Sequence, residues 1–216
     1  LVSDVTVIDR ATIERAGART LPELLAREAG VQMSANGGAG KLSGLFIRGT
    51  ETRHTLLLID GVRYGSATAG TPIWETLPLE MIERIEVLKG PASALYGSDG
   101  VGGVVQVFTR SGATGFAPSA ALSVGSERHL RAAASLTGGH GDWTYALGAQ
   151  RLRQHGDSAT NPKVLFGNHN PDRDPFEQES VQARVRAKMA SGWTVGAGLI
   201  ASEGVTHLDD GPGRDA

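Results

Sequence analysis

The stretch that decides the fold covers residues 82–110 and reads IERIEVLKGPASALYGSDGVGGVVQVFTR. Ile85 and Val87 alternate with charged neighbours, which is the period-two pattern of a strand with one buried face. The Gly-Pro pair at 90–91 ends that strand and predicts a short helical turn, because proline suits the first position of a helix. Glycines between 97 and 103 then lead into a second apolar strand. The stretch predicts a compact unit of two strands joined by a turn and a glycine-rich segment.

Two earlier motifs extend this unit toward the N-terminus: LFIRGT at 45–50 and LLLIDGVR at 56–63. With VLKGPASALYGSDGVGGVVQVFT at 87–109, they resemble, in order, the motifs of the plug domain of TonB-dependent outer-membrane receptors. Within that family, the chain most resembles the cobalamin (vitamin B12) receptors in the segment NGGAGKLSGLFIRGT at 36–50, followed by LLLIDGVR at 56–63 and YGSDGVGGVV at 96–105. The resemblance implies an α+β plug domain followed by antiparallel strands of a transmembrane β-barrel.

Composition and charge exclude several classes of protein. The chain has 216 residues and a net charge of -2, without the basic excess typical of nucleic-acid binding. It contains no cysteine, which excludes disulfides and cysteine-based metal sites. No apolar run is long enough to predict a spanning helix. The chain begins LVSD, without an initiator methionine or a signal peptide, and we expect it to be a fragment of a longer receptor.

The first 112 residues are predicted to form the plug, a small mixed sheet with short helices. Asp9 is placed to cap a first helix, and Thr20 with Glu23 fits a capping box for a second. The continuous apolar run at 56–59 predicts a buried central strand. Outside the signature stretch, helices are expected at 11–15, 21–27 and 77–81, and strands at 5–8, 31–33, 45–48 and 55–60.

Residues 113–216 are predicted to form the first strands of the barrel, which is incomplete here. Along 143–149, 181–189 and 193–201, apolar residues alternate with polar or small ones, as a lipid-facing strand requires. Trp143 and Trp193 each stand where a strand begins after a short turn, the position of an interfacial aromatic girdle. About five strands are expected, and the family resemblance implies a complete barrel of about 22 strands with a plugged lumen.

Two plug loops are candidates for ligand binding. The segment 36–43 is not a phosphate-binding loop, because glycine is missing at 35 and Leu42 follows the lysine. By composition alone, this segment and the segment 64–71 are flexible loops. Plug loops of the family contact the ligand, which implies binding roles for Asn36, Lys41, Leu42, Ser43, Tyr64, Ser66 and Thr68.

Arg48 and Lys89 lie in the IRG and LKGP motifs. The ordinary interpretation is that they are surface residues in ion pairs. The family resemblance implies instead a lock in which both pair with glutamates of the barrel wall. Arginine is the commoner residue of the family at the position of Lys89. Lysine keeps the positive charge but cannot form the two parallel hydrogen bonds of an arginine guanidinium.

Aspartates in the long polar segment 156–176 are candidate calcium ligands, because calcium prefers oxygen ligands on flexible loops. Loop aspartates are more often simply solvated. Cobalamin receptors bind calcium in early extracellular loops, which implies a site at Asp157, Asp172 and Asp174. No other cofactor is expected, and the six histidines lack the spacing of a zinc site.

The family resemblance implies the function of an energised importer in the Gram-negative outer membrane. It would bind cobalamin or a related corrinoid at the cell surface and take energy from TonB, a periplasmic partner. The glycine-rich segment 97–103 matches neither a dinucleotide-binding fingerprint nor a nucleophile elbow, and no enzyme activity is expected. The remaining expected partner is outer-membrane lipid, and no nucleic acid is expected.

Three alternatives stay open. The ligand of the same family could be a ferric siderophore. The protein could instead be a signalling receptor, or a binding module with a soluble β domain in place of a barrel. Partition into detergent separates the last alternative from the others, and ligand titration separates the first.

Overall fold

The computed structural model describes residues 4–28, 30–90, 96–97, 100–156, 158, 163 and 173–207. Contacts divide the chain into two compact units. One unit contains Leu1–Ala35 and Leu42–Thr109, and the other contains Asn36–Lys41 and Arg110–Ala216. The loop 36–41 therefore belongs by its contacts to the second unit, although the sequence places it inside the predicted plug.

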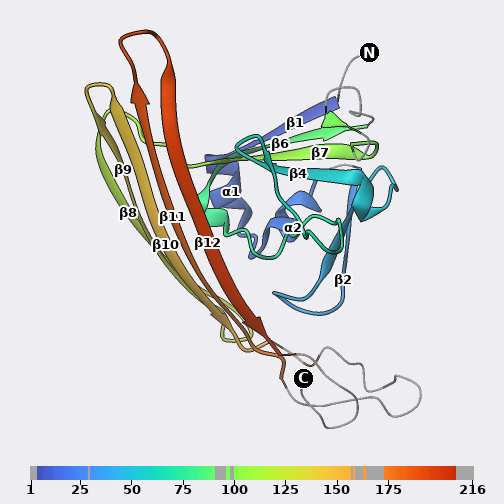
Figure 1. The fold of residues 1–216 in the computed structure, drawn as a ribbon. Coiled ribbons are helices and arrows are strands. Elements are labelled where there is room, and N and C mark those ends of the chain that lie inside the picture. Colours follow the sequence, from blue (N-terminus) through green and yellow to red (C-terminus); the bar gives the residue numbers. More distant parts are fainter. Residues whose placement is uncertain are drawn as a thin grey trace. The chain divides into compact units, whose positions relative to one another are not determined.

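The first unit is built on a mixed sheet with the strand order β1-β6-β7-β4-β5 (Figure 1). Strands β4 and β7 are parallel, and the other neighbours are antiparallel. The mixed sheet confirms the predicted fold class of this part. The strands are β1 Asp4–Asp9, β4 Thr55–Ile59, β5 Val62–Arg63, β6 Ile82–Lys89 and β7 Gly103–Thr109.

The apolar pattern of the sequence explains which strands lie in the core. Ile85 and Val87 are completely buried in β6, while Arg84 before them is exposed and Glu86 between them is half-buried, so the predicted alternation is confirmed. Every residue of β4 is buried, as its continuous apolar run predicts. Burial of these side chains, each favourable by roughly 1.5–3 kcal/mol, holds the signature strands at the centre of the sheet.

Two short helices have the predicted caps. Helix α1, Arg10–Ala16, begins where the Asp9 carboxylate accepts a hydrogen bond from the Thr12 amide, and it ends at Gly17 with a φ of 59°. Helix α2, Leu21–Leu25, begins at Thr20, whose hydroxyl accepts a hydrogen bond from the Glu23 amide. Helix α1 packs against β1 and β6, and α2 packs against the hairpin that follows it.

Two helix predictions are wrong at their ends. The helix expected over 21–27 stops at Leu25, because the amides of Arg27 and Glu28 bond three residues back and tighten the last turn. The helix expected over 77–81 is only a single 3-10 turn, η2, Leu79–Met81. Pro78 has extended geometry there, with a ψ of 127°, and a proline disfavours helical geometry in the residue before it.

The rest of the first unit consists of a hairpin and tight turns. Strands β2 Val31–Ala35 and β3 Ser43–Ile47 form a separate antiparallel pair, and η1, Thr52–His54, precedes β4. The predicted turn at Asp60-Gly61 is confirmed, with φ values of 50° and 85°. This turn leads into β5, a two-residue strand that the sequence pattern does not indicate.

The second unit is an antiparallel meander of long strands, which Figure 1 shows as one curved sheet. The order β12-β11-β10-β9-β8 follows the chain and confirms the five strands expected from the sequence. No helix in the described part of the chain is long and apolar enough to cross a membrane. The strands are β8 Gly115–Val124, β9 Leu130–His140, β10 Trp143–Gln154, β11 Phe176–Lys188 and β12 Thr194–Thr206.

The pairing register places the predicted apolar residues on one face of this sheet. Leu147 lies opposite Leu136 on one side and Ala183 on the other, and Ala183 lies opposite Leu199. Trp143 and Trp193 are 60% and 74% exposed, as the predicted girdle requires. The dyad pattern therefore produces a continuous apolar face across all five strands.

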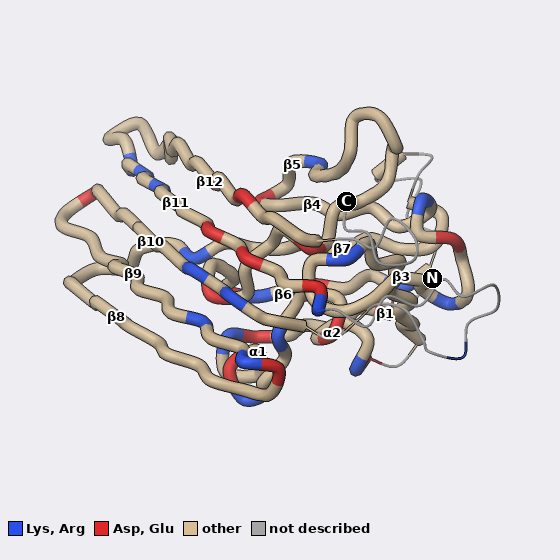
Figure 2. Tube along the Cα trace, turned by 90° about the horizontal axis from the view of Figure 1, so that it is seen from below, with Lys and Arg blue, Asp and Glu red and all other residues tan. Residues whose placement is uncertain are grey.

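Charged residues interrupt the apolar face at the ends of the strands farthest from Trp143. Arg151 pairs with Glu179 at 3.2 Å, Arg153 pairs with Glu177 at 3.1 Å, and Glu203 lies opposite Glu179 in register. Figure 2 shows these mixed blue and red segments on β10, β11 and β12. The apolar band thus lies between the tryptophan end and the charged end of the sheet.

Candidate functional site

The plug loop 64–71 is held in shape by its own hydrogen bonds. The Ser66 amide donates to the Thr71 carbonyl at 2.8 Å, and the Gly70 amide donates to the Ser66 carbonyl at 2.9 Å. The Ser66 hydroxyl lies 3.1 Å from the Thr68 hydroxyl and accepts a hydrogen bond from the Ala69 amide. The segment predicted as a flexible loop therefore has a defined turn in which two candidate ligand residues contact each other.

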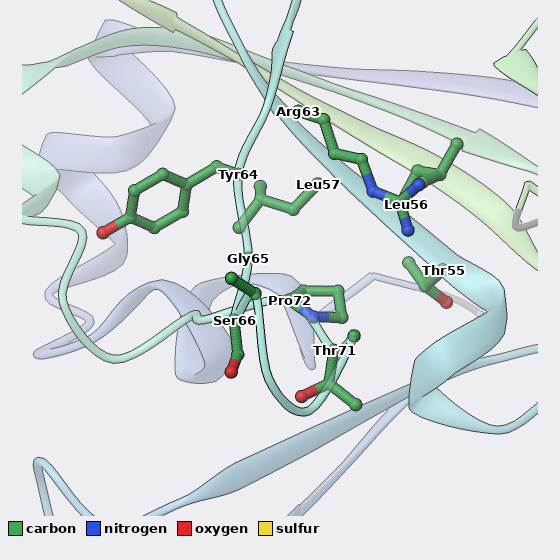
Figure 3. Close-up of a pocket in the computed structure, with 11 residues that line it drawn as sticks. Thr55, Leu56, Leu57, Arg63, Tyr64, Gly65, Ser66, Thr71 and Pro72 are labelled. Atoms are coloured by element: carbon green, nitrogen blue, oxygen red, sulfur yellow. The ribbon is translucent and has the colours of Figure 1, made fainter.

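A cavity of about 350 Å³ lies beneath this loop (Figure 3). Tyr64 closes one side, where its hydroxyl lies 2.8 Å from the hydroxyl of Thr76 and its ring points away from Arg63. The wall also includes Arg63, Thr71 and Pro72, which the sequence does not single out. The complete lining is Thr55, Leu56, Leu57, Arg63, Tyr64, Gly65, Ser66, Ala67, Gly70, Thr71 and Pro72.

The candidate residues of the segment 36–43 do not share one environment. Asn36 and Leu42 are exposed, the latter at 68%, and are accessible for a ligand. Ser43 is buried, and its amide donates a hydrogen bond to the Glu75 carboxylate. Ser43 thus has a visible role in anchoring β3, and sequence reasoning missed Glu75 because no local motif marks it.

Lys41 is buried in the second unit. Its ammonium lies 3.3 Å from Asp174 Oδ1 and donates a hydrogen bond to the carbonyl of His207. The side chains of Lys41 and Asp174 are 2% and 3% exposed. The structure therefore brings together two residues that the sequence assigned to different sites, a ligand loop and a calcium site.

The predicted lock residues lie close together in the first unit. Arg48 donates to the Asp4 carboxylate at 2.9 Å, and Asp4 is the register partner of Lys89 across β1 and β6. Arg48 also approaches Gly90, where an added Cβ would lie 3.2 Å from its guanidinium. Lys89 is 8% exposed, whereas the side chain of Arg48 is 51% exposed. Their pairing with barrel glutamates stays a prediction, and on β8–β12 the glutamates Glu177, Glu179 and Glu203 lie on the apolar face.

Of the three predicted calcium ligands, the structure describes Asp174. Asp157 and Asp172 lie outside the described residues. Asp174 does not fit a calcium ion in its present contacts, because a neighbouring ammonium already neutralises its buried carboxylate. Within the described ranges, no group of three or more His, Cys, Asp or Glu side chains could hold a metal ion.

Comparison with known proteins identifies the family. Residues 1–104 match the TonB-dependent receptor plug domain. The chain is also 34% identical, over 98% of its length, to the vitamin B12 transporter BtuB of Vibrio cholerae. The chain belongs to the TonB-dependent receptor family. Family members are Gram-negative outer-membrane proteins, and the fold, with a plug and the first strands of an outer-membrane barrel, agrees with that location.

Other relatives and solved structures support the same fold. BtuB of Photobacterium profundum is 32% identical over 99% of this chain. The siderophore receptor PirA of Acinetobacter baumannii matches 95% of this chain with a TM-score of 0.78 and 23% identity. This chain covers 32% of the PirA structure. The pyoverdine receptor FpvA of Pseudomonas aeruginosa also reaches a TM-score of 0.78, at 16% identity. The chain spans about a third of the length of the curated relatives, namely 34% of each BtuB sequence.

Proposed function

We propose that the whole protein imports cobalamin or a related corrinoid across the outer membrane, with energy delivered by TonB. The observation that carries this proposal is the identity of 34% to a vitamin B12 transporter, which extends over 98% of the chain and includes the strands as well as the plug. The siderophore receptors of known structure are less similar in sequence, at 16–23% identity, and their likeness concerns the fold.

The loop 64–71 supports binding of a large ligand by a preformed surface. Its hydrogen bonds are made within the loop, so little conformational entropy is lost when a ligand binds. The cavity of about 350 Å³ is near the lower end of the usual range for ligand pockets. We infer that it takes one side group of a corrinoid, while the macrocycle lies against the loop.

A ferric siderophore is the second candidate, and the charge of the strand sheet favours it. Within β8–β12, the face opposite the apolar face carries no aspartate or glutamate. Figure 2 shows the basic stretch on β11 near its turn into β12. A positive surface raises the local concentration of an anionic chelate. The basic residues of this face are Arg131, Arg184, Arg186 and Lys188.

Calorimetric titration of the whole protein in detergent separates the two candidates. We expect tight binding of cyanocobalamin and weak or no binding of ferric enterobactin. Removal of both loop hydroxyls in Ser66→Ala/Thr68→Ala should weaken cyanocobalamin binding, and Thr6→Ala on β1 is the matched control. Binding of the chelate alone would establish the siderophore function instead. Binding of neither probe would contradict the cobalamin proposal and would exclude ferric enterobactin as the siderophore.

A further inference from the structure

The buried pair Lys41–Asp174 connects two segments that are far apart in the sequence. Lys41 ends the short segment Asn36–Lys41, and Asp174 lies just before β11. The second acceptor of the Lys41 ammonium is the carbonyl of His207, directly after β12. The His207 amide in turn donates to the Pro175 carbonyl at 3.3 Å, so both acceptors belong to the same end of the β11–β12 pair.

Two glycines near the pair allow the backbone to lie close to neighbouring groups. A Cβ at Gly40 would overlap the ring of Phe176, and a Cβ at Gly156 would overlap the Asp174 carbonyl. Both glycines have positive φ values, 78° and 60°, which other residues rarely adopt. The glycine before the lysine therefore lets the loop lie directly on the first residue of β11, and Lys41 then reaches the carboxylate.

A buried carboxylate requires a cation or several hydrogen bonds to offset its loss of hydration. In an acidic segment that partner can be a divalent metal, which the family resemblance leads one to expect at Asp174. Here the positive charge comes from the chain itself. A lysine ammonium can donate to several acceptors, and those of Lys41 include one carboxylate and one carbonyl.

We propose that Lys41 serves as a built-in cation that tethers the loop 36–41 to the β11–β12 end, in place of a divalent metal at Asp174. The order of this loop is then independent of calcium. Because the pair is buried, moderate salt has little effect on it. The tether does not depend on which ligand the protein imports.

Hydrogen–deuterium exchange of the whole protein in detergent tests this proposal without a ligand. In the unchanged protein, the exchange rate of the 36–41 peptide should be the same in EDTA and in calcium. Lys41→Met and Asp174→Asn should each raise that rate about tenfold or more, because each leaves one buried charge without its partner. In the double variant Lys41→Met/Asp174→Asn, the exchange rate of the 36–41 peptide should rise by less than the product of the two single increases, because this variant removes both charges.

Arg53→Met is the matched control, since it breaks an ion pair with Glu51 whose side chains are both more than half exposed and should leave the 36–41 rate unchanged. Lys41→Arg retains the charge and provides a second variant if the methionine variant does not fold. Faster exchange of the unchanged protein in EDTA would overturn the proposal. Unchanged exchange in Lys41→Met would overturn it as well.

Discussion

The carboxylate of Asp60 accepts two hydrogen bonds from Thr109, one from its amide at 3.1 Å and one from its hydroxyl at 2.6 Å. Asp60 follows β4, and Thr109 is the last residue of β7, so the contact joins the ends of the two parallel strands. These strands carry two of the three signature motifs. A side chain that the sequence indicates only as part of a turn therefore links the ends of two neighbouring strands of the plug sheet.

We expect Asp60→Ala to destabilise the plug by about 1.5–3 kcal/mol, the usual contribution of hydrogen bonds to a charged group. Alanine is also strained at the φ of 50° found here, whereas asparagine tolerates it. Asp60→Asn should therefore be the milder change. Hydrogen exchange of the β4 and β7 peptides in increasing urea measures the difference. Equal effects of the two substitutions would argue against this account.

The N-cap of α1 should make that helix sensitive to acid. Its hydrogen bond from Thr12 lowers the pKa of the Asp9 carboxyl below the usual value of 3.8. A depressed pKa means that the stabilisation is present above the ordinary value and is lost as pH falls through the lowered value. Exchange of α1 amides should accelerate over that acidic range in the unchanged protein. In Asp9→Asn, which keeps the cap without the charge, this pH dependence should disappear.

From the apolar face, we predict that the free-energy cost of introducing a charged side chain depends on its depth in the bilayer. Leu199 lies in the middle of the apolar band and is 61% exposed, while Glu203 lies in the charged end of the same strand. Leu199→Arg should destabilise the whole protein in lipid by about 2–4 kcal/mol, and Glu203→Arg by at most about 1 kcal/mol. Urea titration in lipid vesicles, followed by tryptophan fluorescence, measures both. Similar values for the two variants would place the bilayer elsewhere on the sheet.

The shape of the loop 64–71 should matter for ligand affinity. A Cβ at Gly65 would lie 2.7 Å from the Thr71 carbonyl oxygen, so Gly65→Ala must displace the loop backbone. We expect weaker binding of cyanocobalamin by about tenfold, corresponding to the 1–3 kcal/mol cost of forcing a packed site apart. Gly148→Ala is the control, because its Cβ would meet neighbours only at an ordinary 3.9 Å. An unchanged affinity of Gly65→Ala would show that the loop does not contact the ligand.

Local patterns predicted most of the elements because the forces behind them act over a few residues. The caps at Asp9 and Thr20 and the alternation around Ile85 each depend on neighbours in the chain. The incorrect predictions also have local causes. The effect of Pro78 on the residue before it shortened a predicted helix to one turn, and β5 was too short to show any period.

The sequence alone determined the family, the mixed plug sheet and the dyad strands, since motif order and hydrophobic period are properties of the chain read in one dimension. Tertiary structure decided the partners of its charged and polar side chains. Lys41 meets Asp174, and Asp60 meets Thr109, across long separations in sequence. A buried charge is neutralised by whichever opposite charge the fold brings within reach, and only the folded chain determines which one that is.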